Sequence, residues 1–432
     1  MKKVFKKIII SVITWQARAI LKRYKPKIIA ITGSVGKTST KDAIFTVLSK
    51  FKTVRKSEKS FNSEIGLPLT IIGVPNGWDN AFMWIENIFK GFVMILSKQP
   101  YPEYLVLEVG VGKPGDIKHR VAPWLKPDMV VITRFPDKPV HIEFFGTAEK
   151  IIEEKSTLAY ALKKNGLLIL NHDDEKVYAL HTKSQSRTVS YGFSENATYK
   201  ATYPGYIDSK DSDIPSGINF KLEYNGNTFP VMLPHVVGMH YVNTALSALA
   251  CASEAGCDLL ESINALKDFR LPAGRLTLIE GMKGSMLIDD TYNSSPVAME
   301  AAIHLLRDIK AKRKVAVIGD MLELGKFTDS EHKEVGKHLS VVADIIVSVG
   351  HRAKFVLVGA EDEGFTKKNM YSFDNSFSAG EFLQGLIKKG DLVLLKGSQG
   401  IRMERALELV MAHPEQKQNL LCRQEREWIA KR

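Results

Sequence analysis

The chain has 432 residues, of which 44% are apolar, and a formal net charge of +12. This length and composition predict two or three domains with apolar cores, and three cysteines are too few for a disulfide framework, which indicates a reducing compartment. The positive charge suits anionic small molecules or an anionic membrane surface. The sequence contains no zinc knuckle, aromatic RNA-binding motif or arginine-rich run, so we expect no nucleic-acid partner.

Residues 1–25 predict a basic amphipathic helix. Lysines and arginines flank an apolar run at residues 8–15, which is far shorter than the ~20 residues that a membrane-spanning helix needs. Phe5, Ile8, Ile9, Val12 and Ile13 fall on one helical face, with lysines on the other. Two interpretations fit this pattern: a helix that lies on a membrane surface, or a helix that packs on the protein's own core.

The next element is a strand that leads into a glycine-rich loop. An apolar run at residues 27–31 predicts a buried strand, and a helical pattern starts at Lys37 after the loop TGSVGKT (residues 32–38). Glycines let backbone N–H groups turn toward an anion, and a helix N-terminus adds about half a positive charge. Lys37 can reach the outer phosphates of ATP, and the Thr38 hydroxyl can ligate Mg²⁺. The predicted phosphate-binding residues are Gly33, Ser34, Val35, Gly36, Lys37, Thr38 and Ser39.

Beyond this loop, strand and helix patterns alternate to about residue 265, as in a mostly parallel sheet with helices on both faces. The predicted strands are residues 27–31, 104–109, 129–133 and 166–170, and residues 191–233 predict a small antiparallel excursion. Residues 81–97 predict an amphipathic helix, packed on the core or forming a second membrane-facing surface. Glu108 ends a strand, where it can hold Mg²⁺ beside the phosphates. His141 and Glu143 are two apart, so on an extended segment both can face a metal or substrate. A helical pattern begins shortly afterwards, at Lys155.

A second α/β unit is predicted after residues 271–275. Its strands are residues 286–288, 314–318, 345–349 and 392–395, with helices between them. Asp289 and Asp290 follow a strand and can grip ribose hydroxyls, and Arg275 can contact a phosphate. Polar groups at the strand ends of both units predict a site between two domains, completed by closure. We assign residues 1–25 to the basic helix, 26–268 to a central ATP-binding domain, 269–412 to a C-terminal domain and 413–432 to a charged helical tail.

The chain resembles the Mur ligases, which build the peptidoglycan stem peptide with ATP. It is most similar to the branch of that family that adds D-alanyl-D-alanine to UDP-N-acetylmuramoyl-tripeptide. The matching segments run in family order from about residue 26 to 405: the phosphate loop, residues 62–70, 108–117, 141–146, 171–174, 272–275, 289–296, 319–325 and 396–398. The resemblance implies an α/β fold, with a phosphate-loop central domain followed by a Rossmann-like C-terminal domain.

The resemblance also implies roles for individual residues. Thr38 and Glu108 resemble a first Mg²⁺ site and His141 a second, and Lys155 stands where the family carries a carbamylated lysine. Arg275 resembles a phosphate contact from the C-terminal domain. Asn243, Asp290 and Asn293 lie in segments that meet the nucleotide, and Glu143, Asn62 and Lys396 face the substrate.

The implied activity is ATP-dependent amide formation through an acyl phosphate, in the cytoplasm or at the inner face of the cell membrane. The partners are a UDP-muramoyl-peptide and D-alanyl-D-alanine, and we expect a monomer. Family members usually carry a UDP-binding domain before the phosphate loop, and residues 1–25 stand in that place here. The alternatives are a relative that uses another amino acid or a membrane-held acceptor, and an inactive ATP-binding relative.

Overall fold

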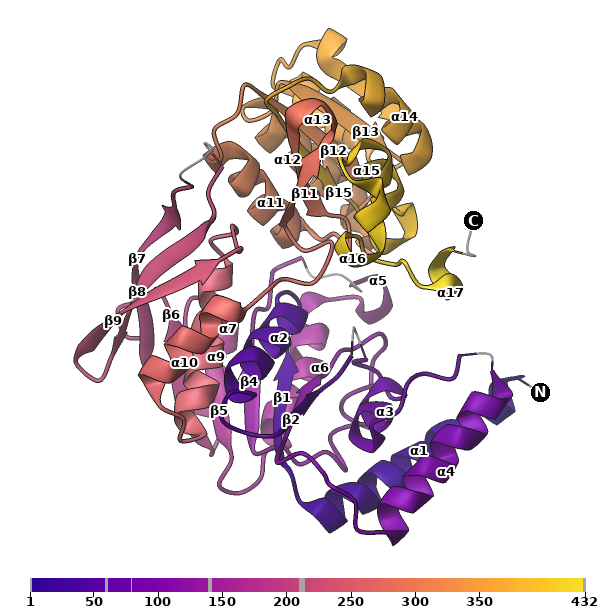
Figure 1. Cartoon of the computed structure of the whole chain (residues 1–432), viewed down its shortest axis with the longest axis vertical. Helices are drawn as coiled ribbons and strands as arrows, with labels where there is room; N and C mark the ends of the chain where they lie inside the picture. Colours follow the sequence, from indigo (N-terminus) through magenta and orange to yellow (C-terminus); the bar gives the residue numbers. More distant parts are fainter. Residues whose placement is uncertain (1, 59–60, 79, 139–141, 210–213, 430–432) are drawn as a thin grey trace.

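The computed structural model describes the chain except residues 1, 59–60, 79, 139–141, 210–213 and 430–432. Two mostly parallel sheets, each with its own helices, form two lobes (Figure 1). This arrangement confirms the predicted α/β class.

The first lobe contains a nine-stranded sheet in the order β2-β3-β1-β4-β5-β6-β7-β8-β9. Pairs are parallel from β2 to β7 and antiparallel from β7 to β9, so the antiparallel excursion is confirmed. The central strands are apolar throughout because helices cover both faces. Its strands are β1 (Lys27–Thr32), β2 (Val54–Lys56), β3 (Tyr104–Glu108), β4 (Met129–Ile132), β5 (Leu167–Asn171), β6 (Arg187–Gly192), β7 (Tyr199–Ile207), β8 (Gly217–Tyr224) and β9 (Asn227–Pro234).

Helices on the first lobe pack on both faces of that sheet. They are α1 (Lys2–Tyr24), α2 (Lys37–Leu48), α3 (Gly66–Ile72), α4 (Ala81–Leu96), α5 (Ile142–Phe145), α6 (Ala148–Tyr160), α7 (Glu175–Tyr178), α8 (Leu180–Lys183), α9 (Tyr241–Glu254), α10 (Leu259–Ala265) and η1 (Leu266–Asp268). One core lies between the sheet, α2 and α9, and the other lies between the sheet, α1, α3 and α6.

The second lobe contains a six-stranded sheet in the order β10-β11-β15-β12-β13-β14, parallel except for the edge strand β10. All four strands predicted for this half are confirmed. Its elements are β10 (Thr277–Gly281), η2 (Met282–Gly284), β11 (Ser285–Asp290), α11 (Pro296–Asp308), β12 (Arg313–Gly319), η3 (Gly325–Phe327), α12 (Thr328–Ser340), β13 (Ile345–Val349), α13 (Lys354–Asp362), η4 (Lys367–Asn369), β14 (Met370–Phe373), α14 (Ser376–Leu386), β15 (Asp391–Lys396), η5 (Gln399–Ile401) and α15 (Glu404–Val410).

The final residues form short turns of helix rather than one long helix. These are η6 (Pro414–Gln416), α16 (Lys417–Leu420) and α17 (Arg426–Ile429). The segment packs on the second lobe, where Leu421, Cys422 and Arg423 are buried.

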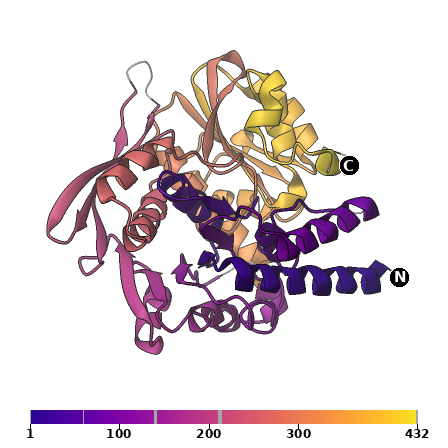
Figure 2. The ribbon, with the colours of Figure 1, turned by 60° about the horizontal axis from the view of Figure 1, so that its bottom comes forward.

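The N-terminal helix α1 packs on the first lobe, beside α3 and α4 (Figure 2). Ile9, Ile13, Ala17 and Ile20 are buried in the core, whereas Ile8 is exposed. The predicted apolar face is therefore divided between the core and solvent, and the side chain of Phe5 lies outside the described residues. Within the described residues, no helix combines the length and apolarity that crossing a bilayer requires.

Two further details of the sequence prediction were wrong. Glu143 belongs to the short helix α5 and not to an extended segment, so the extended geometry that the prediction assumed does not hold from Ile142 onward. Lys155 lies in the interior of α6 and does not begin it. A turn at Gly146, where φ is 79°, separates α5 from α6.

Candidate active site between the two lobes

The glycine-rich loop joins β1 to α2 at the carboxyl edge of the first sheet. Gly33 has φ 136° and Gly36 has φ 85°, in the left-handed region that favours glycine. A Cβ atom on Gly33 would lie 2.0 Å from Oγ1 of Thr133, which follows the neighbouring strand β4. Thr133 in turn donates a hydrogen bond to the Val35 carbonyl over 2.6 Å. Thr133 therefore fixes the conformation of the loop, whose last amides lie at the start of α2.

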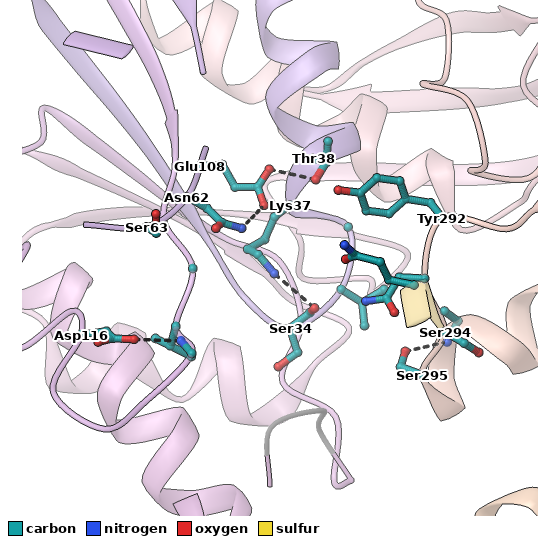
Figure 3. Close-up of a pocket in the computed structure, with 18 of the residues that line it drawn as sticks. Ser34, Lys37, Thr38, Asn62, Ser63, Glu108, Asp116, Tyr292, Ser294 and Ser295 are labelled. Carbon is teal, nitrogen blue, oxygen red and sulfur yellow. Dashed lines mark hydrogen bonds between the residues drawn. The ribbon is translucent and has the colours of Figure 1, made fainter. Parts of the chain in front are cut away.

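Thr38, in the first turn of α2, faces a carboxylate at the end of β3 (Figure 3). Its hydroxyl donates to Oε2 of Glu108 over 2.8 Å, and the Asn62 amide donates to Oε1 over 3.0 Å. Glu108 is buried, so these hydrogen bonds fix the orientation of its carboxylate. The amide of Asn62 thus supports Glu108. Asn62 also lines the cavity between the lobes, and its contact with substrate stays a prediction.

Hard oxygen ligands such as these suit Mg²⁺. The Thr38 hydroxyl and the Glu108 carboxylate lie within hydrogen-bond distance of each other, beside the loop that would hold phosphates. This donor set fits the ion. Among the described residues, no three His, Cys, Asp or Glu side chains cluster as a metal site, so the remaining ligands would come from phosphate oxygens and water. His141, predicted as a ligand of a second ion, lies outside the described residues.

Two lysines approach the loop from different elements. Nζ of Lys37 donates to the Ser34 carbonyl over 3.3 Å, and Nζ of Lys155 donates to Oγ of Ser34 over 2.8 Å. Burial lowers the pKa of Lys37, although Glu108 acts against that shift. Burial and then the charge of Lys37 hold the pKa of Lys155 well below its ordinary value. Helix α6 therefore places the amine of Lys155 beside the loop, where this amine is protonated less readily than that of an ordinary lysine.

The second lobe supplies the opposite wall of the site. The Arg275 guanidinium lies 4.4 Å from the centre of the Tyr292 ring, and Tyr292 faces the phosphate loop in Figure 3. A cavity of about 470 Å³ lies between the lobes. Its walls include the loop residues 34–38, Asn62 and Glu108 from the first lobe, and Arg275 and residues 292–295 from the second.

A second cavity of about 450 Å³ adjoins the first, because Val35, Gly36, Arg275 and Asn293 line both. Ser39, Asn171, Tyr191 and Asn243 line it from the first lobe, and Asp290, His304 and Lys396 from the second. The amide of Asn243 donates to Asp173 over 3.1 Å, while its Oδ1 is buried and has no hydrogen-bond partner in the described part of the chain. An unpartnered buried acceptor here is available to a donor group on a ligand.

Lys396 and Asp290 form a buried ion pair in this second cavity. Nζ of Lys396 lies 2.5 Å from Oδ2 of Asp290 and 2.9 Å from the Asn293 carbonyl. The pair places Lys396 beside the residues predicted to meet the nucleotide, rather than in the first cavity. Glu143 lies elsewhere: its helix packs near Gly325 of the second lobe, and Glu143 is absent from the described linings of both cavities.

The sequence interpretation missed how this part of the site is supported, because it assigned Asp289 to ribose hydroxyls and gave Arg423 no role. Asp289 accepts hydrogen bonds from the Gly274 amide at 3.0 Å and the Thr291 hydroxyl at 2.6 Å, so it fixes the loops that carry Arg275 and Tyr292. Arg423, from the C-terminal segment, donates to the carbonyls of Thr291 and Tyr292. An isolated arginine in a charged tail carries no sequence signal for this contact.

Comparison with known proteins identifies the family. The model of the Mur ligase middle domain matches residues 92–252, and that of the Mur ligase glutamate ligase domain matches residues 274–399. The UDP-N-acetylmuramoyl-tripeptide–D-alanyl-D-alanine ligase of Bacillus subtilis is 31% identical over 405 residues, covering 92% of this chain and 79% of the relative. The chain belongs to the Mur ligase family. The enzyme of the same name from Rickettsia prowazekii is 28% identical over 91% of this Mur ligase and 80% of the relative.

Solved structures agree with this assignment. MurF from Acinetobacter baumannii superposes on this Mur ligase with a TM-score of 0.76 at 26% identity, over 92% of this chain and 79% of that one. MurF from Thermotoga maritima, solved in complex with ADP, gives a TM-score of 0.74 at 26% identity, over 93% and 83% of the two chains. Both lobes and their order along the chain are therefore those of a Mur ligase.

Proposed function

We propose that this Mur ligase is an ATP-dependent amide ligase that adds D-alanyl-D-alanine to UDP-N-acetylmuramoyl-tripeptide. The observation that carries the proposal is the cleft in which Lys37, Thr38 and Glu108 of one lobe face Arg275 and Tyr292 of the other. Relatives named for this reaction align with about nine-tenths of the chain. ATP use places the reaction in the cytoplasm, and one chain contains both walls of the cleft, so a monomer suffices.

The nucleotide spans the two adjoining cavities in this proposal. Its phosphates lie on the loop amides and Lys37, and its base and ribose extend toward Asn243 and Asp290. The unpartnered Oδ1 of Asn243 accepts a hydrogen bond from a ligand there. Arg275 lines both cavities, which suits a contact with the phosphate chain between them.

The main obstacle to the reaction is repulsion between the substrate carboxylate and the triphosphate. Lys37 and Arg275 bring positive charge to this region from opposite lobes, and the loop amides add fixed dipoles. Mg²⁺, held by Thr38 and Glu108, neutralises phosphate charge when bound. The carboxylate oxygen attacks the γ-phosphorus and ADP leaves. The amine of D-alanyl-D-alanine then attacks the acyl carbon, a proton is lost from nitrogen, and inorganic phosphate leaves with the C–O bond electrons.

The amine of Lys155 can be modified to form a further ligand in the proposed site. A low pKa favours the neutral form, and a neutral amine can add to CO₂ with loss of a proton to give a carbamate. Carbamylation would convert this amine into an anionic oxygen ligand beside the phosphate loop. The amine instead hydrogen-bonds Ser34 when it is unmodified.

The test is phosphate release with ATP, UDP-N-acetylmuramoyl-tripeptide and D-alanyl-D-alanine, with the amide product identified by mass. We expect turnover that requires all three substrates and is lost in Lys37→Ala. Lys50→Ala, which removes an exposed lysine just after the C-terminal end of the same helix, is the matched control. ATP binding without amine-dependent turnover would indicate an inactive relative. Turnover with another amino acid, and none with the dipeptide, would indicate a different ligase.

A further inference from the structure

One face of α4 exposes a continuous stripe of large apolar side chains. Phe82, Phe89 and Leu96 are 84%, 66% and 79% exposed, and Ile85 and Phe92 lie between them. Spacings of three and four residues place all five on one side of the helix. Trp84, Asn87 and Gly91, on the opposite side, are buried against the first lobe. A stripe of this kind on a water-soluble surface marks an interaction site.

The N-terminal helix α1 widens this apolar surface. The rings of Trp15 and Phe92 lie 5.9 Å apart between centroids, and Trp15 is 54% exposed. Ile8, two turns earlier on the same face of α1, is also exposed. Trp78, which precedes α4, is exposed as well, and its carbonyl accepts a hydrogen bond from the indole of Trp84. Exposed tryptophans are typical of surfaces that lie at a membrane–water boundary.

The two helices form a rigid parallel pair. The amide of Gln16 donates to the Ile88 carbonyl over 2.7 Å, and the Tyr24 hydroxyl donates to the Met94 carbonyl over 2.9 Å. Both views show the pair side by side (Figures 1 and 2), and Figure 1 shows it at the end of the first lobe away from the second. A flat surface could therefore meet the pair while the cleft between the lobes remains accessible.

The charge of α1 indicates whether this apolar surface binds a second copy of the chain or an anionic lipid membrane. Residues 1–27 contain nine lysines and arginines and no acidic residue: Lys2, Lys3, Lys6, Lys7, Arg18, Lys22, Arg23, Lys25 and Lys27. Lys6, Lys7, Arg18 and Lys22 are exposed on α1. Because a second copy would bring the same cations toward these, its approach is electrostatically opposed. Anionic phosphate headgroups complement them, and each cation near such a surface contributes about 1 kcal/mol, which is about fivefold in affinity.

We propose that α1 and α4 together dock this Mur ligase on an anionic lipid membrane. The stripe enters the boundary between headgroups and acyl chains, and the cations of α1 contact lipid phosphates. The helices lie in the plane of the membrane, as interfacial amphipathic helices do. This docking is independent of the ligase reaction and leaves the cleft between the lobes accessible.

Co-sedimentation of the full chain with vesicles tests the proposal. One set is pure phosphatidylcholine and the other an equal mixture of phosphatidylcholine and phosphatidylglycerol. We expect binding to the anionic vesicles that weakens as salt is raised, and much weaker binding to the neutral ones. The double variant Phe82→Ser/Phe89→Ser should bind the anionic vesicles about 100-fold more weakly, because each exposed ring loses about tenfold in partition. Arg18→Gln/Lys22→Gln should bind about 25-fold more weakly.

The controls separate docking from folding. Val341→Ser/Phe377→Ser removes two exposed apolar side chains from the second lobe, and Lys388→Gln/Lys389→Gln removes two exposed cations there. Both should bind vesicles as the unaltered chain does, and all variants should keep its circular dichroism spectrum and melting temperature. An unaltered chain that stays in the supernatant with both vesicle types overturns the proposal, as does equal binding by Phe82→Ser/Phe89→Ser. A dimer in sedimentation velocity that this double variant dissociates also overturns it, in favour of a second copy.

Discussion

Two buried lysines near the cleft, Lys155 and Lys396, predict losses of stability of different size from the same substitution. Lys155 and Lys396 are 2% and 1% exposed. Nζ of Lys396 lies 2.5 Å from a carboxylate oxygen of Asp290, whereas the hydrogen bond of Lys155 within the described residues goes to the neutral hydroxyl of Ser34. Burial lowers the pKa of both amines, but Asp290 opposes that shift for Lys396 and Lys37 increases it for Lys155. Lys396 is thus held as half of an ion pair, and Lys155 is not.

Replacement by methionine removes the amine from each site at similar volume. Lys396→Met leaves Asp290 as a buried charge without its partner, which costs about 3–5 kcal/mol. Lys155→Met loses one hydrogen bond, worth about 1 kcal/mol, and also removes the cost of burying an amine. We expect Lys155→Met to change the free energy of unfolding by less than about 1 kcal/mol while it abolishes turnover.

Urea unfolding of both variants, in bicarbonate-free buffer, measures this difference. The pH dependence gives a second readout. Between its lowered pKa and 10.5, Lys155 binds a proton in the unfolded chain but not in the folded one, so this group makes the folded state more stable as pH rises. Lys155→Met should lack that contribution. If Lys155→Met costs as much as Lys396→Met, or leaves the pH dependence unchanged, Lys155 is held as a cation and the reasoning fails.

Three further predictions concern single residues of the same site. Glu108→Gln should lower kcat/KM at least about 100-fold and shift the Mg²⁺ requirement upward, with the melting temperature nearly unchanged; unchanged Mg²⁺ titration of phosphate release would contradict its metal role. Burial raises the pKa of Asp289 from 3.8 to about 6. Between these two pH values the folded state binds one proton more than the unfolded state, so the folded state loses about 3 kcal/mol of stability as pH rises through this range. Asp289→Asn should remove that slope in urea unfolding between about pH 4 and pH 7, and parallel profiles would refute the assignment. Gly33→Ala should cost about 3 kcal/mol because its Cβ would meet Thr133, whereas Gly146→Ala, with φ 79° and no neighbour within 4 Å, should cost about 1 kcal/mol. Equal melting temperatures for these two variants would rule out the close packing under the loop.

The strand-and-loop elements of the site were predictable because local patterns specify them. An apolar strand, two glycines and a Lys-Thr pair in that order define the phosphate loop, and a carboxylate at the end of a parallel strand must lie at the same edge of the sheet. Thr38 and Glu108 therefore met as expected. The spacing of His141 and Glu143 was less informative, because a two-residue repeat indicates a shared side only on an extended chain, and the segment from Ile142 is helical.

The sequence by itself determined the two α/β lobes, the phosphate loop and the family, since each depends on patterns within short segments and on their order. Only the tertiary structure decided which charges pair, because Lys396 and Asp290 are 106 residues apart and Arg423 reaches Thr291 across 132. The same holds for the apolar face of α4. Periodicity shows that one side of a helix is apolar, but whether that side meets the core or solvent depends on where the neighbouring helices pack, and here the buried side is that of Trp84 and Gly91.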